Sequence, residues 1–175
     1  MHFSSTTHRF DGDKMKDTIQ KIYEDARAAL YKGDEGELPQ YFTDDAQIML
    51  PGLRQPLGVL QACRTLQRWA GGKFRDFGQH THDTDTSPAR EGILRVSHEM
   101  TLMPIAGSKA IVQLARNEDG TLVVTFTDEV TASRDGEKIK RWEIRCDQPG
   151  LFDDLPEQMS SSDPSTRGTS TTPRQ

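Results

Sequence analysis

Two stretches of the chain carry apolar residues every three or four positions, which is the spacing of a helix that buries one face. The first covers residues 14–32, with Asp13 as the predicted N-cap and Gly33 as the residue that ends it. The second covers residues 57–70. The apolar faces contain Ile19, Ile22, Tyr23, Ala26, Ala29 and Leu30 in the first helix, and Leu60, Cys63, Leu66, Trp69 and Ala70 in the second.

Elsewhere the chain alternates between apolar and polar residues, which indicates β-strands. The expected strands are residues 43–50, 74–84, 92–103, 122–132 and 137–147, and residues 109–115 fit either a strand or a helix. Asp135-Gly136 between the last two strands is typical of a tight hairpin turn. Pro39 suits the first turn of a short helix at residues 39–42. Helices followed by a run of strands predict an α+β domain, with helices on one face of an antiparallel sheet.

The composition confines this domain to the middle of the chain. Of 175 residues, 33% are hydrophobic and 28% are charged. Apolar residues are scarce in residues 1–13, and residues 153–175 are rich in Ser, Thr and Pro. Such segments bury too little apolar surface to offset the entropy lost on folding. We therefore expect a disordered arm at residues 1–13, one domain at residues 14–150 and a disordered tail at residues 151–175.

The same data exclude several classes of protein. No apolar run reaches the ~18 residues that a membrane span needs, and residues 1–13 lack the apolar segment of a secretory signal. Two cysteines, Cys63 and Cys146, are too few for a disulfide framework or a Cys-rich zinc site. The net charge is −5, and no Lys/Arg cluster marks a nucleic-acid surface. We expect a cytoplasmic protein without a membrane or nucleic-acid partner and, since the chain has no Gly-rich phosphate loop, without a cofactor.

Asp128 and His98 stand out because each is a polar residue on an otherwise apolar strand face. A buried carboxylate is costly unless it is paired or protonated, and apolar surroundings make it a better proton acceptor near neutral pH. A β-bulge or a bond to a helix terminus would explain Asp128 without any chemistry. A lone histidine on such a face is often a satisfied core residue. If both residues face one cavity, they form a candidate acid–base pair.

Other residues are candidates for substrate contacts. Tyr23 on the first helix could polarise a carbonyl with its phenol, or it could be a core tyrosine with its hydroxyl at the rim. His80 and His82 share a strand face, a spacing that suits metal ligands beside Asp83 or Asp85. A solvated strand end explains so polar a segment without a metal, and we expect His80 to point inward. The large apolar residues expected to line a pocket are Trp69, Met100, Phe126 and Trp142.

Three short motifs carry a family resemblance through their order along the chain. The first is Tyr41-Phe42-Thr43-Asp44-Asp45-Ala46, and the second is Pro51-Gly52 followed by Gly58 and a helix. The third joins Phe126-Thr127-Asp128-Glu129-Val130 to Lys140-Arg141-Trp142 through the Asp135-Gly136 turn. Together they resemble the nuclear-transport-factor-2-like superfamily and, within it, the SnoaL-like polyketide cyclase group. The resemblance covers residues 14–147.

The resemblance implies a cone-shaped nuclear-transport-factor-2-like half-barrel, in which a curved antiparallel sheet wraps around helices and encloses an internal pocket. It implies that Asp128 occupies the position of a catalytic acid/base aspartate and that Tyr23 points into the cavity. It also implies a homodimer. The Arg-plus-two-Asp set of limonene-epoxide-hydrolase relatives and the Tyr and His set of scytalone dehydratase cannot be placed on this chain.

Two functions of different class remain open at this point. In the first, a small cofactor-free enzyme of secondary metabolism acts on an apolar, carbonyl-bearing polyketide or terpenoid intermediate. Asp128 removes a proton next to the carbonyl, and His98, with Tyr23, stabilises the enolate oxygen. Cyclisation, isomerisation and dehydration share this step, whereas epoxide hydrolysis needs a positioned water and an acid. In the second, the domain is a non-catalytic ligand-binding or dimerisation module, because one fold hosts many functions.

Overall fold

The computed structural model describes residues 7–90, 92–106 and 117–155. Within these ranges two α-helices precede most of a seven-stranded sheet. The elements are α1 (Thr7–Lys32), η1 (Leu38–Gln40), β1 (Phe42–Met49), β2 (Leu57–Gly58), α2 (Val59–Gly71), β3 (Phe74–Arg75), β4 (Thr81–Arg90), β5 (Ile93–Pro104), β6 (Leu122–Ala132), β7 (Ile139–Cys146) and η3 (Pro149–Phe152). The α+β class predicted from the sequence is therefore confirmed.

The sheet has the order β2-β1-β7-β6-β5-β3, and β4 pairs with β5. Strands β4 to β7 form antiparallel pairs, but β1 runs parallel to β7, with Ile48 beside Trp142. The expectation of a purely antiparallel sheet is thus wrong for this one pair. The chain passes through β2, α2 and the four strands β3 to β6 before β7 returns beside β1, and a connection of that length permits parallel pairing.

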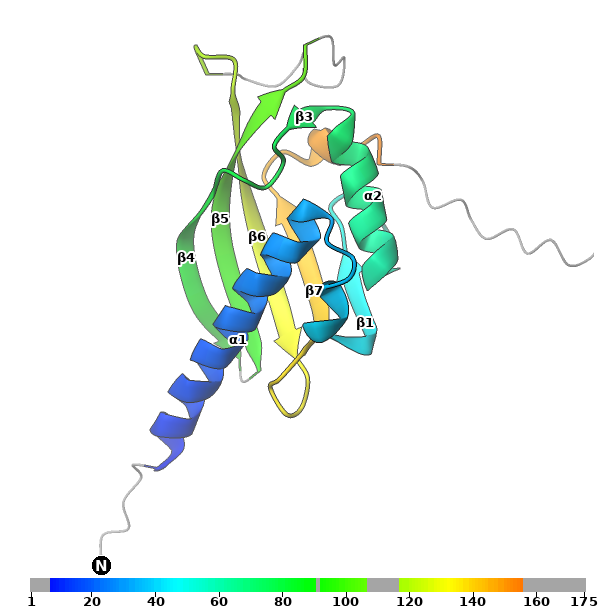
Figure 1. The fold of residues 1–175 in the computed structure, drawn as a ribbon. Helices are drawn as coiled ribbons and strands as arrows, with labels where there is room; N and C mark the ends of the chain where they lie inside the picture. Colours follow the sequence, from blue (N-terminus) through cyan, green and yellow to red (C-terminus); the bar gives the residue numbers. More distant parts are fainter. Residues whose placement is uncertain (1–6, 91, 107–116, 156–175) are drawn as a thin grey trace, which may run out of the picture.

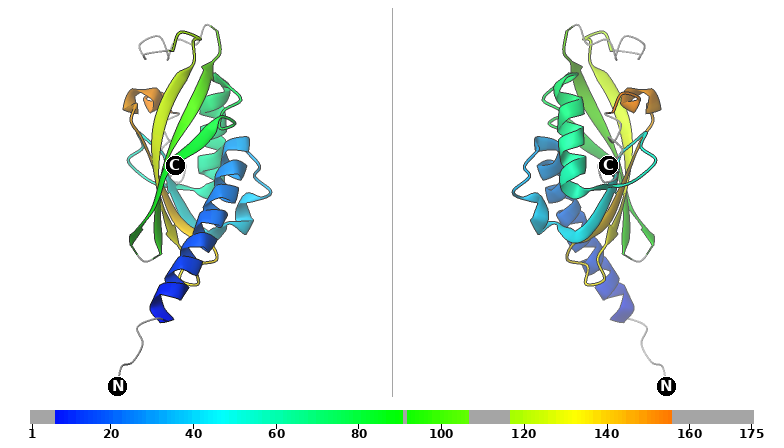
Figure 2. Two further views of the ribbon diagram at one scale, coloured as in Figure 1. Left: turned by 90° about the vertical axis from the view of Figure 1, so that its left-hand side faces the viewer. Right: turned by 90° about the vertical axis from the view of Figure 1, so that its right-hand side faces the viewer.

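Both helices lie on the same face of the sheet (Figure 1). Side views show the long strands curving around that face (Figure 2), as the cone-shaped fold requires. The apolar sides of the helices and the inward residues of the strands form one core. Its largest fully buried side chains include Trp142, Tyr23 and Phe126. No helix in the described part of the chain is long and apolar enough to cross a membrane.

The start of α1 and the strand expected at residues 74–84 differ from the sequence prediction. Helix α1 begins at Thr7, so residues 7–13 are helical rather than disordered, and Asp13 lies inside the helix instead of capping it. The single strand expected at residues 74–84 is split into β3 and β4. The interruption contains Gly78, whose positive φ of 83° breaks the extended backbone between the two strands.

The domain also extends past residue 150, where a tail was predicted to begin. Leu151, Phe152 and Leu155 are buried. Phe152 stacks on Trp69 with 4.3 Å between ring centroids, and Lys73 pairs with Asp154 at 2.6 Å. The segment was predicted to be disordered because its overall composition is polar. Its few apolar residues nevertheless pack the chain after β7 against α2. The ambiguous segment 109–115 and the expected tail beyond residue 155 lie outside the described residues.

Candidate active site

The register between β5 and β6 brings His98 and Asp128 together. Val96 pairs with Asp128, and His98 pairs with Phe126. His98 and Asp128 are therefore diagonal neighbours on the same face of the sheet, a separation that long side chains can span. His98 Nε2 lies 3.0 Å from Asp128 Oδ2, and both side chains are completely buried. The two polar exceptions in the strand patterns thus meet inside the core.

Helix α1 supplies the third member of the cluster. Tyr23 lies on its buried side and donates a hydrogen bond from its phenol to Asp128 Oδ2, at 2.6 Å. The same phenol oxygen accepts a hydrogen bond of 2.9 Å from Nη1 of Arg27, which follows one helical turn later. Because a guanidinium can only donate, the phenol proton must point toward Asp128. The direction of this chain of hydrogen bonds is therefore fixed.

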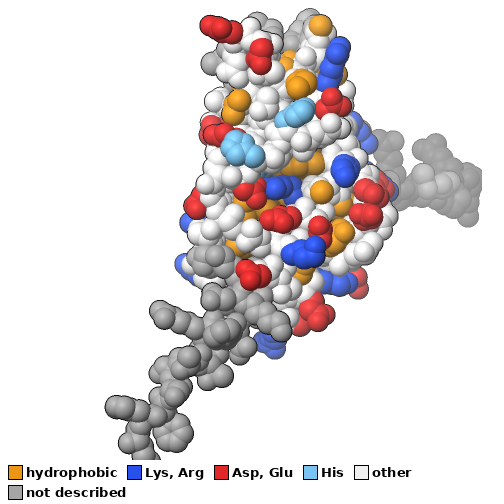
Figure 3. Space-filling view, turned by 60° about the vertical axis from the view of Figure 1, so that its left-hand side comes forward, with side chains coloured by type: hydrophobic (Ala, Val, Ile, Leu, Met, Phe, Trp, Pro, Cys, Tyr) orange, Lys and Arg blue, Asp and Glu red, His pale blue; other side chains and the backbone are white. Residues whose placement is uncertain are grey.

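Arg27 and Asp83 continue the chain to the surface. Arg27 was not predicted as a site residue, and Asp83 was considered only as a possible metal ligand beside His80 and His82. Nη1 of Arg27 lies 2.7 Å from Oδ1 of Asp83, and the two side chains are 14% and 29% exposed. Arg27 was missed because a charged residue on an amphipathic helix looks like part of the solvated face. The available signal was its spacing of four from Tyr23, which stacks the two residues on one side of the helix. Figure 3 shows this face, with basic and acidic side chains next to one another over α1 and β4.

Burial controls the protonation of the phenol and the guanidinium. Burial, followed by the charge of Asp128, raises the pKa of Tyr23 well above its ordinary value. Tyr23 therefore remains a hydrogen-bond donor over the whole neutral range. Burial works against the charge of Arg27, but Tyr23 and Asp83 outweigh it, so the pKa of Arg27 lies above its ordinary value. The cluster thus combines one permanent cation with a carboxylate and an imidazole.

Each of the two sheet residues keeps one polar atom free. Both hydrogen bonds to Asp128 end on Oδ2, and Oδ1 has no partner among the described residues. An ionised Asp128 accepts from Nε2–H of His98, which leaves Nδ1 without a partner there as well. In a neutral imidazole this Nδ1 is an acceptor, and in an imidazolium it is a donor. A hydrogen-bonded pair with one free carboxylate oxygen and one free imidazole nitrogen is suited to removing and donating protons.

Aromatic side chains enclose the cluster. Phe126 stacks on the imidazole of His98, with 5.3 Å between ring centroids. Trp142 meets Tyr23 edge-on at 5.2 Å, and its buried Nε1 has no partner in the described part of the chain. Met100 lies two residues after His98 on the same face of β5 and is fully buried. Tyr31, which was not predicted, lies 6.4 Å from the His98 ring. Apolar walls of this kind strengthen every charge interaction inside them.

Two predicted site residues lie elsewhere. Trp69 packs on Phe152 and donates from Nε1 to Asp154 at 3.3 Å, so it belongs to the aromatic group that holds the end of the domain. The prediction that His80 points inward is wrong, because its side chain is exposed. His80 precedes the first residue of β4 and follows the turn at Gly78, where strand alternation does not set its direction. Histidine side chains are visible on the outside of this face (Figure 3).

The other histidine of this segment does not form a metal site either. His82 is exposed and lies 3.6 Å from Glu99 on the neighbouring strand. In the described ranges no group of three or more His, Cys, Asp and Glu side chains is placed to hold a metal ion.

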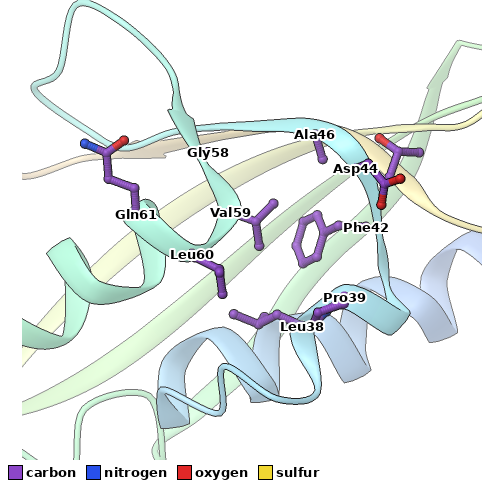
Figure 4. A pocket seen from close by; sticks show the side chains of 10 residues that line it. Leu38, Pro39, Phe42, Asp44, Ala46, Gly58, Val59, Leu60 and Gln61 are labelled. Carbon is purple, nitrogen blue, oxygen red and sulfur yellow. The ribbon is translucent and has the colours of Figure 1, made fainter.

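A separate apolar pocket of about 340 Å³ opens between η1, β1 and the start of α2. Figure 4 shows Leu38, Phe42 and Val59 directed into it, with Asp44 and Gln61 at its edge. Leu60, expected on the buried side of α2, is 43% exposed at this pocket. Phe42 also stacks on Trp142, with 6.2 Å between ring centroids. Two aromatic rings, Phe42 and Trp142, thus separate the pocket from Tyr23.

Comparison with known proteins identifies the fold. Neither a family model nor a curated protein matches the sequence. A SnoaL-like polyketide cyclase from Agrobacterium tumefaciens has a similar structure, with a TM-score of 0.53 and 14% identity over 76% of this chain and 94% of that one. Bal32a, from a soil-derived mobile gene cassette, has a TM-score of 0.53 and 15% identity, over 81% of this chain and 98% of that one. TsrD from Streptomyces laurentii also gives 0.53, with 17% identity over 80% and 96% of the two chains.

The chain therefore has the nuclear-transport-factor-2-like fold of SnoaL-like polyketide cyclases, and the fold expected from the three sequence motifs is confirmed. At identities of 14–17% the likeness concerns the fold. One fold hosts many functions, so the function depends on the residues at the site.

Proposed function

We propose that the protein is a cofactor-free acid–base enzyme that removes a proton next to a carbonyl group of an apolar, polyketide-like or terpenoid-like substrate. The observation that carries the proposal is the asymmetry at Asp128. Tyr23 and His98 both bind Oδ2 of this buried carboxylate, and Oδ1 is left as a base. The names of the structural neighbours make polyketide-like ketones the first compounds to test.

The proposed step divides the work between the two sheet residues. Oδ1 of Asp128 takes the proton from the carbon next to the carbonyl, and the carbonyl oxygen becomes an enolate. An imidazolium at His98 donates from Nδ1 to that oxygen and stabilises its charge. Tyr23 holds Asp128 in place, because its own proton is already committed to Oδ2. This differs from the sequence-based prediction, in which Tyr23 contacts the enolate directly.

Complete burial of the cluster favours a second candidate function, a non-catalytic module. Tyr23, His98 and Asp128 all have 0% exposure. A buried hydrogen-bonded network of this kind also holds α1 against the sheet. In that case the protein would bind a ligand or a second copy of itself without transforming anything.

Hydrogen–deuterium exchange distinguishes the two functions without knowledge of the full reaction. The protein is incubated in D2O with α-tetralone or acetophenone, and loss of the α-hydrogen signal is followed by NMR. We expect the protein to accelerate exchange, and Asp128→Asn to reduce the acceleration about 10²–10⁴-fold, the usual contribution of a general base. His98→Gln is expected to reduce it as well.

A matched control is the same change at Asp85, an exposed residue of β4, which lies on the other side of β5 from β6. The Asp85→Asn variant should accelerate exchange of the ketone's α-hydrogen as much as the wild type does. Circular dichroism and the melting temperature of each variant show whether it is folded. Full exchange activity in a folded Asp128→Asn variant, or none in the wild type, would remove the catalytic proposal and leave the binding module.

A further inference from the structure

Arg27 places a permanent positive charge between the buried cluster and the surface. Its Nη1 contacts the phenol oxygen of Tyr23 at 2.9 Å and the carboxylate of Asp83 at 2.7 Å. Its guanidinium carbon lies 4.9 Å from the centre of the Tyr23 ring. Two hydrogen bonds, of 2.9 Å and 2.6 Å, therefore separate this cation from the carboxylate of Asp128.

Most of the donor capacity of Arg27 is unused. Both hydrogen bonds that the guanidinium makes to described residues come from Nη1. A guanidinium has five N–H donors, so those on Nε and Nη2 are available for a further acceptor. The arrangement that uses them best is a carboxylate bound through two parallel hydrogen bonds. Arg27 can therefore accept a carboxylate in better geometry than Asp83 offers it.

Asp83 shows which kind of group Arg27 binds at this position, and its side chain is open to solvent on one side. It lies on β4, which pairs with β5 alone among the described strands, at a register shift between Asp83 and Asp85. Its side chain is 29% exposed. Exposed ion pairs contribute little net stability. Breaking the Arg27–Asp83 pair should therefore cost little binding free energy when a substrate carboxylate takes the place of Asp83.

We propose that Arg27 binds a carboxylate of the substrate, so that the substrate is a keto acid whose carboxylate lies a few bonds from the carbon that loses its proton. This inference rests on the proposed function and adds a charged group to the apolar carbonyl compound. The carboxylate displaces Asp83 and stays near the surface, while the ketone points inward to Asp128 and His98. The short path from Arg27 through Tyr23 to Asp128 sets the spacing between the two groups.

Two probes that differ only in charge test the proposal: 3-benzoylpropionate and its methyl ester. Their binding to the full chain is measured by isothermal titration calorimetry. The wild type should bind the acid at least about tenfold more tightly than the ester, because the acid accepts two parallel hydrogen bonds from the guanidinium where Asp83 accepts one. Arg27→Met should abolish this preference and leave the affinity for the ester unchanged. Arg27→Lys, which keeps the charge without the planar donor pair, should retain part of it.

The change Asp83→Asn gives a result that a merely structural ion pair would not produce. Removing the internal competitor should strengthen binding of the acid several-fold and leave binding of the ester unchanged. If the Arg27–Asp83 pair only holds α1 to β4, Asp83→Asn and Arg27→Met should both weaken the binding of both probes. The control is Arg64→Met, which breaks the exposed Arg64–Glu35 pair on α2 and should change neither affinity.

The outcomes separate this inference from the proposed function. Asp128→Asn should abolish α-hydrogen exchange but keep the preference for the acid. A wild type that prefers the acid but exchanges no hydrogen refutes the proposed function and supports the carboxylate site. Equal affinities of the wild type for the two probes, or no binding of the acid at millimolar concentration, would overturn the carboxylate site, whether or not exchange occurs.

Discussion

The change Tyr23→Phe removes one oxygen atom that connects helix α1 to both charged ends of the cluster. The oxygen donates to Asp128 at 2.6 Å and accepts from Arg27 at 2.9 Å. Hydrogen bonds to charged groups contribute about 1.5–3 kcal/mol each. Asp128 keeps its bond to His98, and Arg27 keeps its bond to Asp83, so neither group is left without a partner. We therefore expect a net loss of about 3 kcal/mol in the free energy of unfolding.

Urea unfolding followed by circular dichroism measures this loss, and calorimetry should show a melting temperature lowered by roughly 6–12 °C for a chain of this size. The ring remains in place, so the edge contact with Trp142 is preserved. Tyr31→Phe is the matched control, since it is the same change on the same helix. Tyr31 is buried, and its hydroxyl has no hydrogen-bond partner among the described residues.

We expect Tyr31→Phe to stay within about 0.5 kcal/mol of the wild type, as is usual for changes that remove no interaction. Equal stability of the two variants would show that the phenol of Tyr23 contributes nothing to holding α1. A double-mutant cycle with Asp128→Asn localises the effect. The coupling between the two changes should be at least about 1 kcal/mol, because the residues share a hydrogen bond.

Two further predictions concern the backbone and the pH dependence. Gly78→Ala should lower the free energy of unfolding in urea by at least about 2 kcal/mol, because it adds a Cβ at φ 83° against the Tyr31 side chain. The control Gly120→Ala, at φ 82° in open space, should lower it by about 1 kcal/mol. Burial raises the pKa of Tyr23 and Tyr31 above 10.0, so their contribution to stability is complete below pH 10 and is lost as the pH rises through the folded-state values. Phenolate absorbance of the folded protein should therefore stay below that of the urea-unfolded chain at pH 10, and equal titration curves would contradict the burial of both phenols.

The sequence could predict those site residues that interrupt an apolar pattern. Asp128 and His98 are polar positions on alternating strands, and alternation alone places both on the inner face. Their strands were expected to be antiparallel neighbours, so the two side chains could be expected to lie close together. Tyr23 lay on the apolar face of a predicted helix and pointed to the same interior.

Arg27 and Asp83 could not be predicted, because in the sequence they look like ordinary charged surface residues. Arg27 is a charged residue on a helix, and Asp83 lies in a run of polar residues, so neither interrupts a pattern. Only the packing of α1 across β4 brings them together. His80 shows the reverse error, since its predicted direction relied on a strand that the turn at Gly78 interrupts. Local patterns thus identified the buried acid–base groups but not the route that joins them to solvent.

The parallel pairing of β1 with β7 also has a consequence for how the chain folds as it is made. Strand β1 emerges early during synthesis, but its neighbour β7 is the last of the described strands to appear. Until then β1 has only the two-residue strand β2 beside it within the described fold, and its other edge remains open. Contacts between such distant segments form slowly, and unpaired edges are where chains associate wrongly. Fragments that stop before Ile139 should therefore aggregate, and β7 completes the sheet.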